Sequence, residues 1–502
     1  MKRHRKKAND GCKAGAPSGL GQRWKSIDFK KAEAEVRRLQ VRIAKAMKEG
    51  KPNKIKALQW LLTHSWSAKL LAVRRVTRNK GSRTPGIDGE VWKTPAKRMR
   101  GVLTLNRKGY RAMPLRRIKI PKGKGGFRNL GIPTMRDRAM QALYLLALEP
   151  VAEMTADPNS YGFRRFRACR DAIEQCFIAL GNLYSAVWVL DADIRACFDW
   201  IDHTWLLENI PMDRKVLKEW LRCGFVENGQ LFPTYSGTPQ GGIASPTLAN
   251  MALDGLEAVV KQSCPRGSKV NFIRYADDFI VTAKDPQLLR EKVIPAIKAF
   301  LKERGLCLSE TKTKILSIND GFDFLGQTLR KFRGKLIIQP SKQSIHRLLE
   351  KIRLDAERFV GARADKMVDC INPRIRGWCN FHRYVQSSQT FSYIDHHVFK
   401  ILWQWARRQH PKKSNRWRIN KYFPHGDWLF TANVKLRDKT RRIVPVRKAV
   451  STRLYRYIKI RGAASPFDPD FQEYFEYRRT HAPVKLVANV NRFVYNEVAG
   501  SY

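Results

Sequence analysis

Apolar residues recur at helical spacing in the first part of the chain. They follow one another at intervals of three and four, as at Val36, Leu39, Ile43 and Met47, which is the spacing of one helix face. A Gly-Lys-Pro-Asn stretch at 50–53 interrupts this pattern, and a second helical pattern follows it. The sequence therefore predicts a helical N-terminal extension at 23–85, with a flexible basic arm at 1–22 before it.

The pattern changes after about residue 86. Short β-branched runs alternate with helical segments as far as residue 340, which is typical of a fold that mixes helices and strands. Segment 114–134 reads as two strands joined by a basic, glycine-rich turn, and segment 188–202 as a buried strand that runs into a helix. Amphipathic helices are expected at 341–359 and 391–410, before a basic C-terminal part.

The chain carries a very large positive charge. Lys and Arg number 97 against 44 Asp and Glu, which gives a formal net charge of +53. A compact protein with this excess repels itself, so we expect a polyanionic partner, and the phosphate backbone of a nucleic acid is the usual one. We expect no membrane partner, because no apolar run approaches the roughly 18 residues that cross a bilayer. A secretory signal has an apolar core after its basic residues, and the basic N-terminus of this chain has none.

The cysteines favour a reduced compartment. The chain has nine of them, an odd number, and none forms a C-x-x-C pair. Scattered thiols fit a cytoplasmic protein better than a disulfide framework or a zinc module. We therefore expect a cytoplasmic protein.

Two adjacent acids, Asp277 and Asp278, stand between the strand-like runs NFIRY and FIVTAK. Neighbouring residues on a flat strand point to opposite faces, so both carboxylates can converge only at a turn, such as a hairpin tip. They repel each other there unless a cation neutralises them, and Mg²⁺ suits this role because carboxylates and substrate phosphates hold it. Asp193, at the end of another predicted strand, could complete a two-metal site for phosphoryl transfer. The alternative is an ordinary solvated turn.

The motifs around these acids resemble a known family. YADD in the predicted hairpin, DADIRACFD earlier in the chain and SGTPQGGIASPTLANMALDGLE between them resemble the palm of reverse transcriptases. Further stretches are similar to the successive blocks and the maturase signature of group II intron reverse transcriptases, and they lie at 114–153, 159–165, 308–315, 322–329 and 372–423. The resemblance covers about residues 23 to 480.

This resemblance implies an α+β fold of the right-hand polymerase type. Fingers and palm would occupy residues 86–340, with an antiparallel sheet that carries the YADD hairpin. An α-helical thumb with maturase function would follow at 341–424. A small basic DNA-binding domain with a short C-terminal end would occupy 425–502.

The resemblance also implies roles for single residues. Asp193, Asp277 and Asp278 would be catalytic and, with the carbonyl of Ile194, would bind two Mg²⁺ ions. Phe198 would lie under the ribose and exclude a 2′-hydroxyl, although a core aromatic position is the alternative. The residues that would bind the incoming dNTP or the primer end are Arg116, Lys122, Arg128, Phe198, Gln240 and Lys312.

A basic and aromatic cluster in the predicted thumb points to RNA, because such side chains contact phosphates and stack on splayed bases. Trp378 and Trp403 are expected in the core of the thumb rather than on RNA. The residues implied to bind intron RNA are Arg374, Arg376, His382, Arg383, Arg407 and Arg408.

Together these features predict an intron-encoded RNA-directed DNA polymerase. It would bind its group II intron RNA, assist splicing as a maturase, and support mobility by reverse splicing into target DNA and target-primed cDNA synthesis near the nucleoid. No cysteine follows Cys379, so we expect no zinc-bearing HNH endonuclease. Two alternatives stay open: a non-enzymatic maturase with a vestigial polymerase, and a reverse transcriptase captured for DNA repair or defence. The oligomeric state stays open as well.

Overall fold

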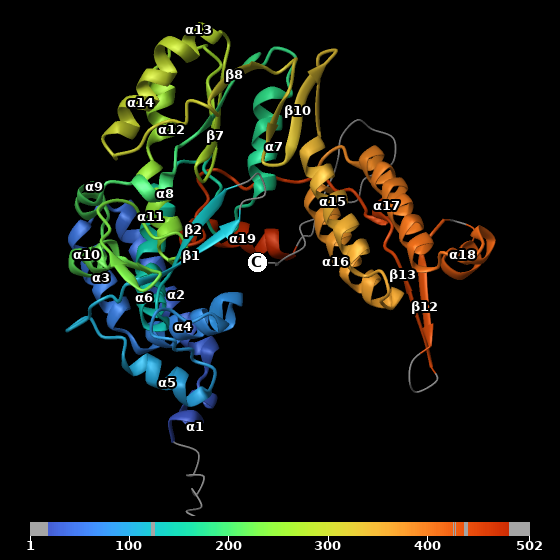
Figure 1. The fold of residues 1–502 in the computed structure, drawn as a ribbon. Coiled ribbons are helices and arrows are strands. Elements are labelled where there is room, and N and C mark those ends of the chain that lie inside the picture. Colours follow the sequence, from blue (N-terminus) through green and yellow to red (C-terminus); the bar gives the residue numbers. More distant parts are fainter. Residues whose placement is uncertain (1–18, 122–125, 425, 427, 436–439, 481–502) are drawn as a thin grey trace, which may run out of the picture.

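The computed structural model describes residues 19–121, 126–424, 426, 428–435 and 440–480 (Figure 1). Of the predicted arm, residues 1–18 lie outside this part, and Gly19 begins the first helix. The fold mixes helices with three sheets of three or four strands and one two-stranded ribbon.

Helices in the N-terminal part surround one buried helix. α6 (Met135–Thr155) is buried along most of its length, and α2, α3 and α4 all pack against it. The helical pattern read from the sequence is confirmed, because α2 buries Val36 and Ile43 while Asp28 caps its first turn. The other helices of this layer are α1 (Gly19–Lys25), α2 (Phe29–Lys48), α3 (Pro52–His64), α4 (Trp66–Arg78), the short η1 (Lys80–Arg83) and α5 (Pro95–Leu103).

A small sheet stands above this layer. Its strand order is β2-β1-β4-β5; β1 pairs antiparallel with β2 and parallel with β4. The two strands predicted around the glycine-rich turn are therefore present, and the turn itself, 122–125, lies outside the described residues. The strands are β1 (Leu115–Pro121), β2 (Phe127–Ile132), β4 (Phe225–Glu227) and β5 (Gln230–Phe232).

A second four-stranded sheet, here called the central sheet, has the order β6-β7-β3-β8. It consists of β3 (Trp188–Asp193), β6 (Asn271–Tyr275), β7 (Asp278–Ala283) and β8 (Lys314–Ser317). Side chains alternate between its faces, so Leu190 joins the core shared with the N-terminal helices. Val189 and Ile280 join a different core, under α7 (Cys169–Leu180). The central sheet is thus covered on both faces.

Several short helices connect or cover these sheets. α12 and α14 pack on each other beside the central sheet (Figure 1). These helices are α8 (Cys197–Trp200), α9 (His203–Asn209), α10 (Arg214–Arg222), α11 (Ser245–Leu253), α12 (Leu256–Gln262), α13 (Pro286–Leu288), the π-helix η2 (Leu289–Val293) and α14 (Ile294–Lys302).

A third sheet leads into a three-helix bundle with its own core. The sheet order is β11-β10-β9, formed by β9 (Phe322–Phe324), β10 (Gln327–Phe332) and β11 (Lys335–Pro340). The bundle core contains Ile352, Ile371, Ile394 and Trp405, all nearly free of solvent. The helices are α15 (Lys342–Arg358), α16 (Ala364–His382) and α17 (Ser388–Gln409), followed by α18 (Asn415–Tyr422).

The chain divides its last described residues between two regions. The ribbon β12 (Thr431–Lys435) and β13 (Arg441–Pro445) packs on α16, with the short η3 (Ala449–Ser451) on α17. Residues 455–471, here called the C-terminal strap, contain η4 (Pro469–Phe471) and return to the core under α7, where Ile460 and Ala464 are buried. The strap ends in α19 (Gln472–Thr480), which Figure 1 shows between the central sheet and the bundle.

Candidate active site

The three predicted acids meet at one edge of the central sheet. β3 ends at Asp193 and β7 begins at Asp278, and the two are register partners across the antiparallel pair. Asp277 lies in the two-residue turn between β6 and β7, and its carbonyl oxygen accepts a hydrogen bond of 3.4 Å from Ile194 N. The structure therefore brings Asp193, Ile194, Asp277 and Asp278 together although the chain separates them.

The turn that carries Asp277 is held from outside. Ala276 has φ of +59°, a left-handed conformation that a tight hairpin turn needs. The loop before α7 packs against this turn so closely that a Cβ at Gly162 would lie 2.4 Å from Ala276 N. Only glycine fits there, so the position of the turn depends on Gly162.

The acids destabilise each other's charged forms. Loss of hydration and repulsion from Asp277 and Asp193 raise the pKa of Asp278 to about 7. Taken as a whole residue, Asp278 is exposed at the start of β7, but its carboxyl group lies among other acids and protein atoms. The pKa of Asp277 is also raised, by loss of hydration first. Burial, with Asp193 as second cause, raises the pKa of Asp191 to about 6.

Two basic side chains act against this repulsion. Lys312 Nζ contacts Asp193 Oδ2, and this hydrogen bond raises the pKa of the lysine. Lys312 lowers the pKa of both Asp277 and Asp278, and Arg128 lowers that of Asp277. The predicted residues Lys312 and Arg128 therefore belong electrostatically to the same site.

The donor set suits a hard cation. Three carboxylates at one sheet edge, two of them with raised pKa, are the oxygen ligands that Mg²⁺ prefers. Within the described residues, however, no group of three or more His, Cys, Asp or Glu side chains is arranged to hold a metal ion, and Lys312 contacts Asp193 instead. The two-metal site stays a prediction.

The other predicted nucleotide-binding residues lie on β1, β2 and the loops beside them. Arg116 is half-buried on β1, and its Nε is buried without a hydrogen-bond partner. Arg128 is exposed on β2. Lys122 lies outside the described residues.

Gln240 lies in a loop and Phe198 in the short helix α8, and both are tied to their neighbours. Gln240 O accepts a hydrogen bond of 2.7 Å from Gly131 N on β2, and Phe198 O accepts one of 2.7 Å from Thr238 N. Phe198 is half-buried, and its ring meets that of Phe163 edge-on at 6.1 Å. Both readings of Phe198, nucleotide contact and packing, are compatible with this position.

Arg274 is a supporting residue that the sequence analysis missed. Its side chain is fully buried, and its Nη2 lies 2.5 Å from Asp254 Oδ1. Its Nη1 donates to Asn250 Oδ1 at 3.2 Å and to the turn carbonyl of Ala276 at 3.4 Å. The signal was present, because Arg274 is a charged residue inside the strand-like run NFIRY.

Comparison with known families decides the identity of the chain. The family model described as reverse transcriptase (RNA-dependent DNA polymerase) matches residues 120–329, and that of the N-terminal domain of reverse transcriptase matches 24–105. The group II intron maturase-specific domain matches 345–423. Protein YkfC of Escherichia coli (strain K12) is 30% identical over 366 residues, which cover 61% of this chain and 95% of YkfC. This chain belongs to the group II intron reverse transcriptase and maturase family.

Other relatives agree with this assignment. The group II intron-encoded protein LtrA of Lactococcus lactis is 30% identical over 344 residues, 54% of this chain and 56% of LtrA, so the chain spans about half the length of that relative. A solved structure of telomerase from Candida albicans in complex with the TWJ fragment of telomeric RNA matches with a TM-score of 0.35 and 11% identity, covering 64% of this chain and 60% of that one. A likeness at that level carries no argument. The reverse transcriptase match places the chain among RNA-directed DNA polymerases.

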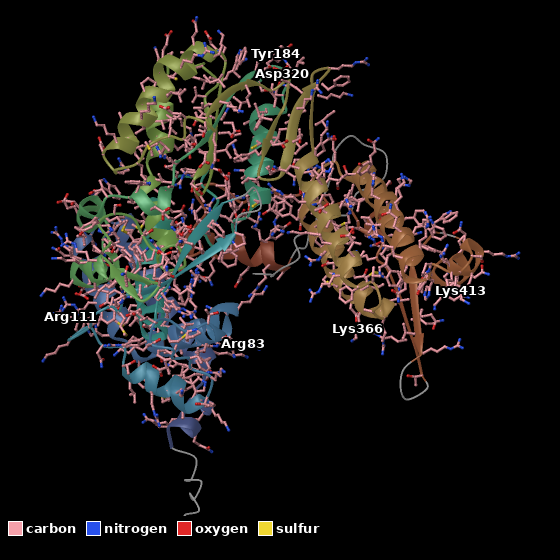
Figure 2. All side chains as sticks on the ribbon, viewed as in Figure 1. Arg83, Arg111, Tyr184, Asp320, Lys366 and Lys413 are labelled. Carbon is pink, nitrogen blue, oxygen red and sulfur yellow. The ribbon has the colours of Figure 1, made fainter. Side chains whose placement is uncertain are left out.

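Basic side chains of this reverse transcriptase spread over both halves of the molecule. Figure 2 shows Arg83 and Arg111 on the N-terminal half, and Lys366 and Lys413 on the half that contains the bundle. No helix in the part of the chain that the structure describes combines the length and apolar character that a membrane crossing requires. The distribution of charge fits an extended polyanion better than a single small ligand.

The arginines predicted to bind RNA in the maturase region differ in their exposure and in their acidic partners. Arg376 and Arg407 are exposed on α16 and α17. Arg408 is exposed and lies 3.3 Å from Glu357. Arg374 forms a two-point pair with Asp355, in which Nη2 donates to Oδ1 at 3.0 Å, and its charge is therefore compensated.

Two of the predicted RNA-binding residues have partners inside the protein. Arg383 is half-buried, donates to Arg453 O at 3.2 Å and lies 3.9 Å over the ring of Tyr455. His382 is 1% exposed, and its two ring nitrogens bond to Gln327 Oε1 at 3.1 Å and Ser344 Oγ at 3.0 Å. The RNA contact of His382 stays a prediction, and in this structure the side chain bonds to residues of α15 and β10 inside the protein.

Proposed function

We propose that this chain copies RNA into DNA at the edge of the central sheet, by nucleotidyl transfer from dNTPs with Asp193, Asp277 and Asp278 as catalytic acids. The register pairing of Asp193 with Asp278 is the observation that carries this proposal. It supports a site in which carboxylates from distant parts of the chain act on one reacting group.

Asp193, Asp277, Asp278 and the carbonyl of Ile194 would hold two Mg²⁺ ions. The chemistry that such ions supply when bound is the neutralisation of charge on the attacking and leaving oxygens of an in-line displacement. The raised pKa values of Asp277 and Asp278 support this role, because carboxylates packed together without a cation favour protonation.

The positive residues around the acids would bind the triphosphate. Arg116, Lys122 and Arg128 would contact its oxygens, since charge-assisted hydrogen bonds to phosphate are strong and positioning is the main task of the protein in phosphoryl transfer. Gln240 would contact the nucleotide, and Phe198 would lie under its ribose. Lys312 would hold the Asp193 carboxylate and so keep the primer end in line.

Replacement of two acids tests the proposal. The double variant Asp277→Ala, Asp278→Ala should lose primer extension on an RNA template by at least about a thousandfold, because the charges that stabilise the transition state are removed. Asp320→Ala is the matched control, since Figure 2 shows this acid at the far end of the molecule from the N-terminal helices. Extension by the double variant at the control rate would overturn the assignment.

The same chain is proposed to act as a maturase in a ribonucleoprotein with its intron RNA. The match of the maturase-specific domain to 345–423 supports this role, and the exposed Arg376 and Arg407 offer phosphate contacts. The complex would insert the intron into target DNA by reverse splicing and copy it from a DNA primer, in the cytoplasm at the nucleoid.

The surroundings of the reading frame separate this role from capture for repair or defence. Catalytic intron RNA domains on both sides of the gene are expected. Purified protein added to that RNA should raise the splicing rate, and the double acid variant should do so equally well. Absence of intron sequence at both flanks would favour a captured polymerase instead.

A further inference from the structure

A cavity of about 1090 Å³ lies beside the hairpin that carries the acids. Most of its lining comes from the loop and first turn between 165 and 173 with Tyr275, from the end of α16 with Arg383, and from α19, and Arg37 of α2 lines it as well. The lining contains seven arginines and a single acid, Glu476. The cavity is at the upper end of the range for small-molecule pockets, about 300–1,000 Å³, and its charge favours a polyanion.

α19 reaches this position because the C-terminal strap is fastened to the start of α7. Asp171 is fully buried there, and it accepts hydrogen bonds from Tyr457 Oη at 2.8 Å and from Ile460 N at 2.9 Å. Arg167 Nη2 donates to the carbonyl oxygens of Gly462 at 2.8 Å and Ala464 at 3.1 Å. These contacts join residues that lie 286 to 297 positions apart in the chain.

The strap is fastened a second time, to the N-terminal helix α2. Lys48 Nζ lies 2.6 Å from Asp468 Oδ2 and 2.7 Å from Asp470 Oδ2. α19 itself touches the loop before α7, where the rings of Phe166 and Phe475 are 5.3 Å apart. The helix is therefore a fixed wall of the cavity and not a loose end.

Of the arginines that line the cavity, Arg165 pairs with Glu149, whereas three others bond to backbone carbonyls. Arg167, Arg478 and Arg37 donate to backbone carbonyls of the strap, at Gly462, Ile458 and Pro466. Such bonds orient a guanidinium group without cancelling its charge, and aromatic rings such as Phe166 and Phe475 offer stacking surfaces beside it. Arg479, at the end of α19, is exposed and lines the same cavity.

The cavity borders the hairpin that carries two of the acids. Tyr275 lines it and is the register partner of Asp278 across the hairpin. Partners in register lie on the same face of a sheet, so Asp278 and its own partner Asp193 lie on the face to which Tyr275 belongs. A nucleic acid end bound in the cavity would therefore lie next to the hairpin of the acids.

We propose that this cavity holds the end of the RNA template–DNA primer helix, and that α19 forms one wall of it, with Arg479 on a backbone phosphate. The C-terminal strap then belongs to the polymerase site itself, in addition to any contact of the neighbouring ribbon with target DNA. The inference rests on the proposed function for the identity of the helix, and it assigns a binding task to α19.

Equilibrium binding tests this without any chemistry. Fluorescence anisotropy with a labelled RNA–DNA template–primer, in the absence of dNTPs, is measured across a salt series for the full chain and for Arg479→Ala. Loss of one charge-assisted phosphate contact should weaken binding about tenfold and lower the slope of log K against log salt by about one. Arg290→Ala is the matched control, because this exposed arginine lies in η2, next to α13 at the top of Figure 1; it should change neither quantity.

A second variant tests the fastening of the strap. Tyr457→Phe removes the hydroxyl that donates to Asp171 and keeps the buried ring. Like Arg479→Ala, it should weaken template–primer binding, here about threefold. Equal affinity of Arg479→Ala and Arg290→Ala for the template–primer would overturn the inference. It would also be overturned if Arg479→Ala lost as much affinity for single-stranded RNA of the same length as for the template–primer.

The binding result can be separated from the result of the primer-extension test. If the wild type fails to extend primers but Arg479→Ala still weakens helix binding, the proposed function fails and the binding site remains. If primer extension is intact and Arg479→Ala binds as the control does, the inference fails alone.

Discussion

Lys312 Nζ contacts Asp193 Oδ2, although 119 positions separate the two residues in the chain. The same ammonium group lowers the pKa of Asp277 and of Asp278, against burial and mutual repulsion that raise both. One exposed lysine therefore contacts one of the three acids and favours the charged form of the other two. Because Asp278 has a pKa of about 7 even with this lysine present, the charge of the site depends on pH near neutrality.

Removal of this lysine should move the pH dependence of polymerisation. In Lys312→Ala the carboxyl pKa values rise further, since an influence that lowers them is lost. The proposed activity needs ionised carboxylates, so the acidic limb of the pH–rate profile should shift to higher pH, and the loss of rate should be largest below about pH 7. Steady-state primer extension over a pH series measures this shift.

Lys335→Ala is the control for the loss of one positive charge, because Lys335 is exposed at the start of β11. Its profile should coincide with that of the wild type. A rate that falls equally at every pH in Lys312→Ala would show that the lysine acts by contact with substrate rather than on the acids.

Arg274 should be among the most costly residues to replace. Its buried guanidinium group compensates Asp254 and bonds the carbonyl of Ala276 in the turn. In Arg274→Met the Asp254 carboxyl, whose pKa burial already raises to about 6, loses its partner. Breaking one side of a buried pair costs about 3–5 kcal/mol, which urea unfolding followed by tryptophan fluorescence should detect.

The exposed pair of Arg353 and Glu357 provides the comparison. Their N···O distance is 3.4 Å on the surface of α15, and such pairs contribute about 0.2–1 kcal/mol. Arg353→Met should therefore leave the unfolding midpoint nearly unchanged. A similarly small effect of Arg274→Met would mean that the turn does not depend on the buried pair.

The sequence predicts the convergence of the acids because the signals for it are local. Asp277 and Asp278 sit between two apolar runs, and Asp193 ends a third; in antiparallel strands such ends meet at one sheet edge. The pairing of Arg274 with Asp254 has no such signal, since a salt bridge between separate elements depends on tertiary packing. The contact of Asp171 with Tyr457 spans 286 positions, and no periodicity in the chain indicates it.

His382 shows a different limit of sequence reasoning. A run such as RIRGWCNFHR predicts a helix with basic and aromatic residues, but the pattern leaves open which polar residue points inwards. The structure turns His382 toward Gln327 of β10 and Ser344 of α15, because the end of α16 is covered on both sides. Arg376 on the same helix is exposed, and its RNA contact stays a prediction.

Acid should weaken the bundle through His382. Burial lowers the pKa of this residue to about 3, from an ordinary value of 6.5. Between these values the unfolded chain binds a proton that the folded chain does not, so stability is complete above about pH 6.5 and falls as the pH drops. His382→Gln keeps polar contacts and cannot titrate, so its unfolding midpoint should fall less steeply with acid.

RNA binding provides the complementary measurement on the same helix. His382→Gln should leave affinity for intron RNA unchanged, while Arg376→Ala should lower the slope of log K against log salt by about one. The exposed His346 serves as control for stability, since His346→Gln should not alter the acid dependence. Loss of RNA affinity in a folded His382→Gln protein would support the prediction that this residue contacts RNA.

Phe198 should decide between deoxyribonucleotides and ribonucleotides. Phe198 is half-buried, and its ring leans edge-on against Phe163, the residue after Gly162, which packs on the turn of the acids. In Phe198→Ala the space for a 2′-hydroxyl opens, and the ratio of kcat/KM for rNTP over dNTP should rise by about 10–200-fold, as for other changes of fit in an apolar pocket. Single-nucleotide incorporation with matched dNTP and rNTP measures this ratio.

The alternative, that Phe198 is only a packing residue, predicts a different pattern. Loss of packing would lower the rate with both nucleotides by the same factor and leave their ratio unchanged, together with a lower unfolding midpoint. Phe332→Ala, at an exposed ring on β10, controls for the loss of an aromatic side chain elsewhere. Because the discriminating quantity is a ratio measured on one protein, partial misfolding of Phe198→Ala cannot imitate the change expected from an opened ribose site.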